Sequence, residues 1–211
     1  MKKDDLIDYM VKAGTLKSKT IIKAFRSVAR EKFVLPEYKK HAYIDEPLPI
    51  LADQTISQPT TIAIMTEALE PKTGQKILEI GAGSGYQAAI LSKIVGPKGK
   101  IYTIERIKEL YAFAAKNLQS YRNVEIILGD GSKGYAKFSP YDRIIVTAGT
   151  PKIPKILFKQ LKEGGIMIVP IGPGANQKMF KIEKVNNKMK TKDIGYFRFV
   201  PLIGEFGHKE D

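Results

Sequence analysis

Glycines alternate with other residues directly after an apolar segment of this chain. The segment Lys76–Ile80 includes an acid at Glu79, and Gly81, Gly83 and Gly85 follow it. Glycine permits tight turns with positive φ and lets a ligand approach the backbone without a Cβ in the way. Free N–H groups at the start of the next helix would point to the same place. The pattern predicts a nucleotide-type binding turn, although a plain strand-to-helix connection would use the same residues.

The sixth position of this loop separates two classes of ligand. A dinucleotide fingerprint has glycine at its first, third and sixth positions, whereas the sixth position here is Tyr86. The close approach that a pyrophosphate needs is therefore not provided. The order acid-x-Gly-x-Gly-x-Gly instead resembles the loop of S-adenosylmethionine-dependent methyltransferases, whose cationic ligand tolerates a carboxylate such as Glu79 nearby.

Two further carboxylates end the next predicted strands. Glu105 follows the apolar run 100–104, and Asp130 with Gly131 follows the run 124–128. Ligands of open α/β sheets bind beyond the carboxyl ends of the strands. We therefore expect Glu105 to accept hydrogen bonds from ribose hydroxyls and Asp130 to accept one from the adenine amino group, with Gly131 letting the ring lie close.

Strands and helices alternate through the middle of the chain. Apolar strands are expected at 77–80, 101–104, 124–128, 143–147 and 166–170, and helices at 86–95, 107–120 and 152–162. This order is typical of a doubly wound, mostly parallel α/β sheet. Gly164 and Gly165 are expected to stop the last of these helices.

The flanks complete the expected single domain. We interpret residues 1–60 as a helical cap and substrate loop, 61–170 as the cofactor-binding core, and 171–211 as C-terminal strands and tail. Apolar spacing predicts helices within 4–30, and prolines interrupt the stretch after it.

The C-terminal part is predicted to contain two more strands. They are expected at 178–185 and 195–200, with Asn186 and Asn187 in the turn between them. As an antiparallel hairpin, they would complete a seven-stranded sheet of the methyltransferase type.

The composition excludes several kinds of chemistry. The chain has no cysteine, which excludes disulfides, thiolate nucleophiles and cysteine metal sites. His41 and His208 are its two histidines, so no metal site is expected, and neither residue is given a role. No run of 18 or more apolar residues is present, and the charged start does not resemble a signal peptide. We expect a cytoplasmic protein that does not enter a membrane.

The net charge of +13 is concentrated in the flanks. Residues 1–40 carry 11 basic and 5 acidic groups and residues 152–198 carry 11 and 3, whereas residues 41–151 carry 12 and 11. Lysines spaced along helices and strands are typical of a solvated face. Attraction of an acidic partner, either a peptide or RNA, is the alternative.

The segment before the core and several later motifs closely resemble the protein-L-isoaspartate (D-aspartate) O-methyltransferase family. The most specific elements are Tyr43-x-Asp-x-Pro-Leu48 and Gln54–Pro59. Further matching motifs are Gly81–Ala89, Gly129–Gly131, Ile144–Ala148 and Phe199–Leu202. The resemblance runs from about Arg30 to Leu202. Leu51-Ala52-Asp53 departs from it, because the family often has glycines there.

This resemblance implies a repair reaction and assigns several residues to it. S-adenosylmethionine would donate a methyl group to the free α-carboxylate of L-isoaspartyl (and D-aspartyl) residues in damaged proteins and peptides. The resemblance makes Ser57 the essential hydroxyl, whereas the sequence alone favours a turn or helix cap at this serine. It places Gln54, Thr55 and Ile56 over the cofactor. On the substrate side it places Ser57, the backbone of Val200, and Asp45 as a carboxylate that fixes the loop.

The expected reaction needs alignment rather than a general base. A free α-carboxylate has a pKa of about 3.5 and is ionised at neutral pH. Bringing its oxygen into line with the methyl group and the sulfur can supply roughly 7–11 kcal/mol through proximity. Excluding water also helps, because a hydrated carboxylate is a poor nucleophile.

Two alternatives share the cofactor loop. An RNA base methyltransferase would need an acid or amide after the fourth strand, where this chain has Thr147-Ala-Gly-Thr-Pro151. A non-catalytic adenosyl-ligand module would bind the cofactor without turnover. Neither explains Gln54–Pro59, so we expect isoaspartyl proteins and not nucleic acid as partners. The sequence does not predict the oligomeric state.

Overall fold

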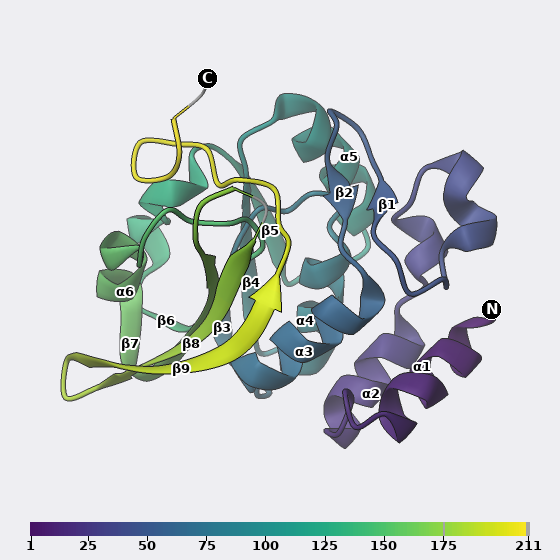
Figure 1. The fold of residues 1–211 in the computed structure, drawn as a ribbon, viewed down its shortest axis with the longest axis horizontal. Coiled ribbons are helices and arrows are strands. Elements are labelled where there is room, and N and C mark those ends of the chain that lie inside the picture. Colours follow the sequence, from purple (N-terminus) through teal and green to yellow (C-terminus); the bar gives the residue numbers. More distant parts are fainter. Residues whose placement is uncertain (175, 210–211) are drawn as a thin grey trace.

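A seven-stranded sheet forms the centre of the protein (Figure 1). The computed structural model describes residues 1–174 and 176–209. Its strands lie in the order β5-β4-β3-β6-β7-β8-β9. The five strands from β5 to β7 are parallel, and β8 and β9 add an antiparallel hairpin. The predicted doubly wound, mostly parallel sheet with a C-terminal hairpin is confirmed.

The elements alternate along the chain as the sequence indicates. The strands are β3 (Lys76–Ile80), β4 (Lys100–Glu105), β5 (Val124–Leu128), β6 (Tyr141–Val146), β7 (Leu161–Ile171), β8 (Gln177–Val185) and β9 (Lys188–Phe197). The α-helices are α1 (Lys3–Lys12), α2 (Lys19–Ser27), α3 (Pro59–Leu69), α4 (Tyr86–Val95), α5 (Lys108–Leu118) and α6 (Lys155–Gln160). Short 3-10 helices lie at η1 (Arg30–Lys32), η2 (Pro36–His41), η3 (Gly131–Lys133) and η4 (Ala136–Phe138).

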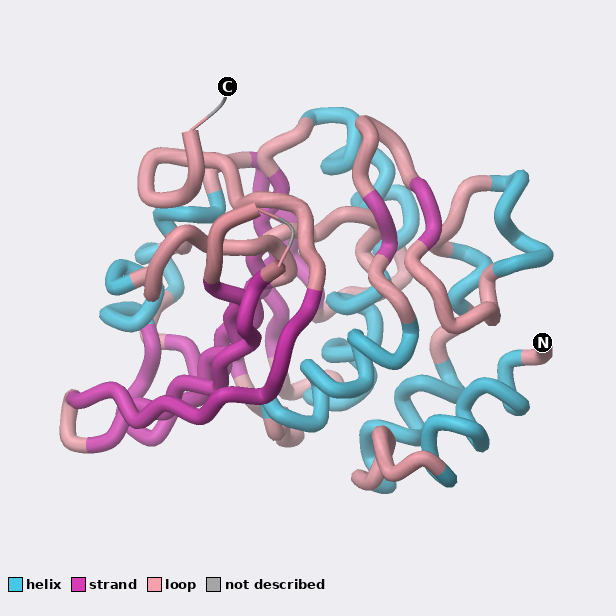
Figure 2. The backbone as a smooth tube through the Cα atoms, in the orientation of Figure 1, coloured by secondary structure: helices cyan, strands magenta, loops and turns pink. Residues whose placement is uncertain are grey.

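Apolar side chains are buried on both faces of the sheet. Successive side chains of a strand point to opposite faces, so one strand contributes to two separate cores. Ile77 and Ile101 belong to the core cluster that also contains apolar residues of helices α1 to α5. Leu78 and Ile104 belong to the second cluster, together with Leu157 of α6. Figure 2 shows the helical cap beside the strand-rich part of the molecule. The two cores hold the carboxyl ends of the strands in fixed positions.

The loop between the cap and α3 contains a short hairpin, formed by β1 (Leu48–Pro49) and β2 (Thr55–Ile56). Its turn includes Ala52 and Asp53 at φ 55° and 52°. These are left-handed conformations that glycine adopts more easily. The departure of this chain from the glycines of the family therefore leaves a left-handed turn in place.

Two predicted boundaries are wrong. Helix α6 ends at Gln160, and Gly164 and Gly165 lie inside β7 rather than before it. Tyr141 pairs with Leu161 and Arg143 with Ile166, so the intervening residues of β7 form a bulge. Gly164 has φ +73°, and a Cβ on Gly165 would lie 2.7 Å from the Lys162 carbonyl oxygen. Glycine is therefore needed for a bulge and not for a helix stop.

The last strand also begins earlier than expected, at Lys188 instead of residue 195. Asn186 and Asn187 both have positive φ, 51° and 59°, which matches the right-handed twist of a tight hairpin. Pairing therefore resumes directly after the turn, with Val185 opposite Lys188. The start of this strand could not be recognised from the sequence, because its lysines give it the polar composition of an exposed edge strand.

Candidate active site

The glycine loop lies between β3 and α4 and is held by close contacts. Gly81, Gly83 and Gly85 have φ 94°, 54° and 87°. A Cβ on Gly81 would lie 2.5 Å from Thr147 Oγ1, and a Cβ on Gly85 would lie 2.9 Å from the Leu118 side chain. Since the N–H group of Gly81 also donates to the carbonyl oxygen of residue 104 at 2.9 Å, the loop is tied to the end of β4.

Glu105 is fixed at the end of β4 by two backbone donors. The N–H of Gly83 donates to its Oε2 and the N–H of Ile107 to its Oε1, each at 3.0 Å. The side chain is 6 % exposed and lines the main cavity. Each carboxylate oxygen keeps a lone pair for a ligand, so the group is a preorganised acceptor.

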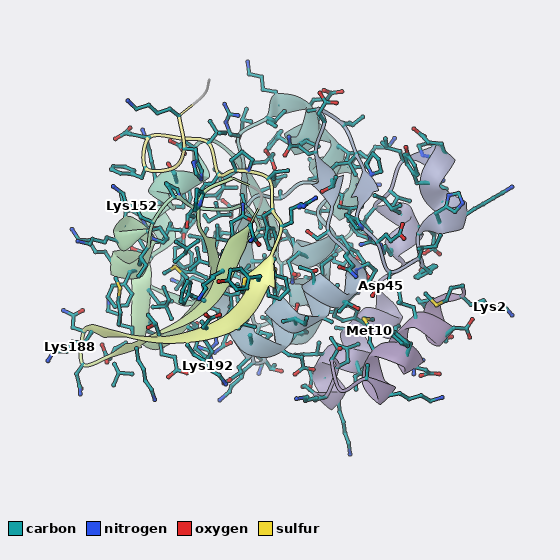
Figure 3. The ribbon with its side chains drawn as sticks, in the orientation of Figure 1. Lys2, Met10, Asp45, Lys152, Lys188 and Lys192 are labelled. Atoms are coloured by element: carbon teal, nitrogen blue, oxygen red, sulfur yellow. The ribbon has the colours of Figure 1, made fainter. Side chains whose placement is uncertain are left out.

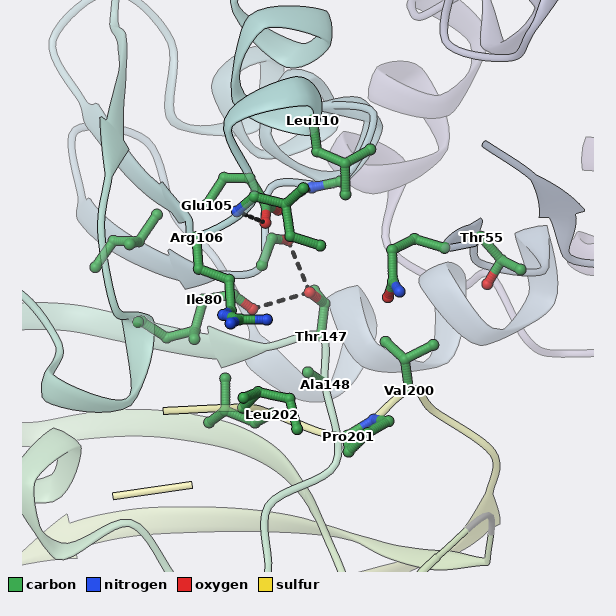
Figure 4. A pocket seen from close by; sticks show the side chains of 17 residues that line it. Thr55, Ile80, Glu105, Arg106, Leu110, Thr147, Ala148, Val200, Pro201 and Leu202 are labelled. Atoms are coloured by element: carbon green, nitrogen blue, oxygen red, sulfur yellow. Dashed lines mark hydrogen bonds between the residues drawn. The ribbon is translucent and has the colours of Figure 1, made fainter. Parts of the chain in front are cut away.

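The main cavity opens at the carboxyl ends of the strands and has about 760 Å³ of space, including part of its mouth. The predicted residues that line it are Gln54, Thr55, Gly81, Gly83, Glu105, Gly131 and Val200. A Cβ on Gly131 would lie 2.6 Å from Ile80 Cγ2, so close packing against Ile80 requires glycine at this position. Figure 4 shows the cavity between the ends of β3, β4 and β6 and the C-terminal segment.

Several lining residues were not predicted. They are Ile80, Ile104, Arg106, Ile107, Leu110, Thr147, Ala148, Pro201, Leu202 and Ile203. Thr147 Oγ1 contacts the carbonyl oxygens of Ile80 and Gly81 at 2.9 and 2.8 Å. Glu105 is the last residue of β4, and Arg106 and Thr147 directly follow the ends of β4 and β6. Their position at the carboxyl ends of the strands could therefore have identified Arg106 and Thr147 as well. Leu202 and Ile203 come from a distant segment; Leu202 belongs to the family-like motif Phe199–Leu202, whereas Ile203 carries no such signal.

A second, inner cavity of about 430 Å³ adjoins the first. The two share the lining residues Thr55, Gly81, Gly83 and Thr147. Ile56, Ser57 and Glu79 line the inner cavity. The predicted residues from the hairpin loop and from the glycine loop therefore line two adjoining cavities.

Glu79 is fully buried beside this inner cavity. Neither carboxyl oxygen has a hydrogen-bond partner in the described part of the chain. Burial raises the pKa of Glu79 to about 8; the nearby Thr103 hydroxyl opposes this increase, and the Glu105 carboxylate adds to it. The side chain is therefore mostly protonated at neutral pH, which differs from the ionised acid that the sequence suggests.

Asp130 holds the C-terminal segment instead of lining either cavity. Its carboxylate accepts hydrogen bonds from the N–H of Ser132 at 2.9 Å, from the Ser132 hydroxyl at 2.7 Å and from the N–H of Glu205 at 2.9 Å. Burial alone would raise the pKa of Asp130, but these donors and nearby Lys133 lower it below its usual range. A contact of Asp130 with adenine stays a prediction.

Asp45 caps the helix that follows Ser57. Its carboxylate accepts hydrogen bonds from the N–H of Thr60 at 2.8 Å, from the Thr60 hydroxyl at 2.6 Å and from Gln58 Nε2 at 3.2 Å. Because Asp45 accepts a hydrogen bond from a free backbone N–H group in the first turn of α3, Ser57 is not needed to cap this helix. No described residue forms a hydrogen bond with the Ser57 hydroxyl, which is free to bind a ligand.

Val200 contributes backbone groups at the rim of the main cavity. Its carbonyl oxygen accepts a hydrogen bond from the N–H of Gly149 at 2.8 Å, and the N–H of Leu202 donates to the Gly149 carbonyl oxygen at 2.8 Å. The Val200 N–H has no acceptor among the described residues. One edge of this segment is therefore open to an extended peptide.

Comparison with known proteins shows the family of this chain. A sequence profile described as Protein-L-isoaspartate(D-aspartate) O-methyltransferase matches residues 1–207. The chain belongs to this family.

Similar protein-L-isoaspartate O-methyltransferases come from archaea. The chain is 48% identical to that of Staphylothermus marinus over 97% of its own length and 95% of the relative. It is 50% identical to that of Pyrococcus horikoshii over 95% of its own length and 93% of the relative. The match to these family members thus extends over nearly the whole of both chains.

Solved structures of this family have the same fold. One protein-L-isoaspartate O-methyltransferase is 34% identical, has a TM-score of 0.89, and aligns over 98% of this chain and 67% of its own. A Plasmodium falciparum structure in complex with S-adenosyl-L-homocysteine is 23% identical, has a TM-score of 0.84, and aligns over 96% of this chain and 99% of its own.

The described residues contain neither a membrane helix nor a metal cluster. No helix among residues 1–174 and 176–209 is long and apolar enough to cross a membrane. The same residues contain no group of three or more histidine, cysteine, aspartate or glutamate side chains that could hold a metal ion.

Proposed function

We propose that this protein transfers a methyl group from S-adenosylmethionine to the free α-carboxylate of L-isoaspartyl residues, and to D-aspartyl residues, in damaged proteins and peptides. The observation that carries the proposal is the free hydroxyl of Ser57 in an inner cavity that joins the main cavity at the glycine loop. Membership of the isoaspartate methyltransferase family supports the same reaction.

The residues of the main cavity fit an adenosyl ligand. The fixed carboxylate of Glu105 suits two neighbouring ribose hydroxyls, because both its oxygens are held in place. Gly131 and Ile80 line the cavity where the adenosyl part would lie, and Gln54, Thr55 and Ile56 would cover the methionine part. When bound, S-adenosylmethionine supplies a methyl group on a positively charged sulfur.

Glu79 suits a cationic ligand in a different way from Glu105. It would hold a buried acceptor behind the glycine loop, and an approaching ammonium or sulfonium charge would favour its ionised form. The free-energy cost of burying the Glu79 carboxylate would then be offset when the cationic ligand is bound.

The inner cavity suits a carboxylate acceptor. The Ser57 hydroxyl would donate a hydrogen bond to one carboxylate oxygen and leave the other oxygen free to attack the methyl group. No proton has to move, because a free α-carboxylate is already ionised at neutral pH. Closure of the Gln54–Ser57 segment would exclude water from the reacting oxygen.

The backbone beside the cavity suits an extended peptide. The free N–H of Val200 would bind a substrate carbonyl oxygen in a strand-addition mode, which tolerates many sequences. Asp45 would act on the substrate side by fixing the loop that carries Ser57. Isoaspartyl proteins are therefore the partners we propose, and the cytoplasm remains the location predicted from the sequence.

An RNA substrate is less well supported by the same geometry. The segment after β6 has its Gly149 N–H and carbonyl groups bound to the C-terminal segment and offers no side-chain amide or acid for a base edge. The lysines of β9 lie elsewhere: Figure 3 shows Lys188 and Lys192 far from Asp45.

The position of the transferred methyl group tests the proposal. An isoaspartyl peptide is incubated with the protein and isotopically labelled S-adenosylmethionine, and tandem mass spectrometry locates the label. We expect a base-labile methyl ester on the isoaspartyl residue. A base-stable methyl group, or label on added RNA and not on the peptide, would contradict the proposed reaction.

A further inference from the structure

Arg30 is a buried cation that forms no salt bridge within the described part of the chain, although the charge of Asp45 lies near enough to favour its ionised form. The side chain is 0 % exposed, and its Nε and Nη1 atoms have no hydrogen-bond partner in the described part of the chain. Nη2 makes one long hydrogen bond, to the carbonyl oxygen of Glu46 at 3.4 Å. Burial lowers the pKa of Arg30 to about 10, so the guanidinium is still charged at neutral pH.

The guanidinium lies between two parts of the proposed acceptor site. Its central carbon is 5.3 Å from the centroid of the Tyr86 ring, which is a cation–π contact. Tyr86 is the first residue of α4 and lines the inner cavity. On its other side, the Glu46 carbonyl belongs to the loop in which Asp45 caps α3 through Thr60.

Arg30 therefore connects the two walls that face Ser57. The wall from the glycine loop includes Tyr86, and the wall from the hairpin loop is held by Asp45. A shift of the guanidinium would move one wall relative to the other. Ser57 directly follows β2 and lies three residues before Thr60, which Asp45 binds, so it would move with the second wall.

Stability does not account for a cation in this position. Burying a cation whose donors are not all hydrogen-bonded costs free energy, because the charge has to leave water. The contact with the Tyr86 ring and one long hydrogen bond offset only part of this cost, since two nitrogens of Arg30 have no hydrogen-bond partner among the described residues. A role of Arg30 in the reaction would explain why a buried guanidinium is present at this position.

We propose that Arg30 is a positioning residue for the acceptor: it holds Tyr86 and the Asp45–Glu46 loop so that the inner cavity presents Ser57 to a substrate carboxylate. The inference rests on the proposed function and extends it to a residue outside both cavities. Arg30 acts through Tyr86 and the loop, and it leaves the Glu105 side of the cofactor cavity unchanged.

Arg30→Met tests this role, because methionine keeps most of the length and removes the charge. The control is Arg26→Met, since Arg26 lies in the same cap, is exposed, and pairs with Asp4 and Asp8. Three quantities are measured for each protein: the melting temperature, the affinity for S-adenosyl-L-homocysteine by calorimetry, and KM and kcat for an isoaspartyl peptide. Arg30→Lys, which keeps the charge without the planar fork, serves as the milder second variant.

For Arg30→Met we expect KM for the peptide to rise about tenfold, with S-adenosyl-L-homocysteine affinity within about twofold of wild type and no loss of melting temperature. Arg30→Lys should give an intermediate KM, and Arg26→Met an unchanged one. An unchanged KM in Arg30→Met would overturn the inference, as would a parallel loss of melting temperature, ligand affinity and activity. If Arg30→Met does not fold, the same criteria apply to Arg30→Lys. A wild-type protein that does not methylate the peptide refutes the proposed function itself and is thus a distinguishable result.

Discussion

The backbone N–H of Gly83 donates a hydrogen bond to Glu105 Oε2 at 3.0 Å, which joins the tip of the glycine loop to the end of the neighbouring strand. The second oxygen of the same carboxylate accepts from the N–H of Ile107. Two separate sequence signals, a glycine loop and an acid after a strand, are therefore parts of one preorganised binding element.

Glu105→Gln should weaken cofactor binding more than it lowers turnover. Glutamine has one acceptor oxygen, so its NH2 group would face the N–H of Gly83 or of Ile107. A hydrogen bond to a charged group contributes about 1.5–3 kcal/mol, and the expected loss of S-adenosyl-L-homocysteine affinity is roughly 10- to 150-fold. Calorimetric titration measures it, with Glu125→Gln as the control, since Glu125 is a half-buried acid on β5 that lines neither cavity. Equal affinities for wild type and Glu105→Gln would remove Glu105 from the proposed cofactor site.

Ser57→Ala should have the opposite effect. The hydroxyl has no partner in the described chain, so its removal leaves no buried group unsatisfied and should not change the melting temperature. The lost hydrogen bond to the substrate carboxylate should lower kcat/KM for an isoaspartyl peptide by about 10- to 150-fold. Affinity for S-adenosyl-L-homocysteine should stay the same. Steady-state kinetics with Ser27→Ala as the control decide the point, and full activity in Ser57→Ala would show that the hydroxyl does not bind the acceptor.

Ser132→Ala should loosen the C-terminal wall of the main cavity. The Ser132 hydroxyl contacts Asp130 at 2.7 Å and accepts a hydrogen bond from the N–H of Phe206 at 3.0 Å. Its loss should release the segment that follows Leu202 and weaken S-adenosyl-L-homocysteine binding several-fold, as measured by calorimetry.

Lys133→Ala is the matched control for that prediction. Lys133 pairs with Glu205 of the same segment at 2.6 Å, but the two side chains are 51% and 58% exposed, and an exposed pair contributes little. If Lys133→Ala weakens binding as much as Ser132→Ala does, the buried hydrogen bonds are not what holds this wall.

These examples show what could be predicted from the sequence. Glu105 and the glycines were identifiable because strand ends and φ-permissive residues leave local signals. The contact of Asp130 with the C-terminal segment was not, since its partner Glu205 lies 75 residues away and contact between them exists only in the folded chain. Likewise, the glycine pair 164–165 fits a helix stop or a β-bulge, and pairing with β6 decides between them. The division at residues 60 and 170 stays a prediction.

Glu79 should make stability depend on pH. Its pKa rises from 4.5 to about 8 on folding, so the folded state binds more protons than the unfolded state between these values. Stability contributed by the protonated side chain is fully present below about 4.5 and is lost as the pH rises through about 8. Glu79→Gln, which is neutral throughout, should lack this loss.

Thermal unfolding of the ligand-free protein from pH 5 to pH 9 measures the effect. The melting temperature of wild type should fall relative to that of Glu79→Gln across this range. A constant difference between the two proteins would mean that Glu79 does not change its ionisation on folding.

The comparison of two peptides that differ in one linkage tests the central claim most directly. The wild-type protein is given an isoaspartyl peptide or its normal aspartyl counterpart with labelled S-adenosylmethionine, and base-labile methyl ester is counted over time. We predict that the isoaspartyl peptide is methylated and the aspartyl peptide is not. Equal labelling of both peptides, or labelling of neither, would contradict the proposed function.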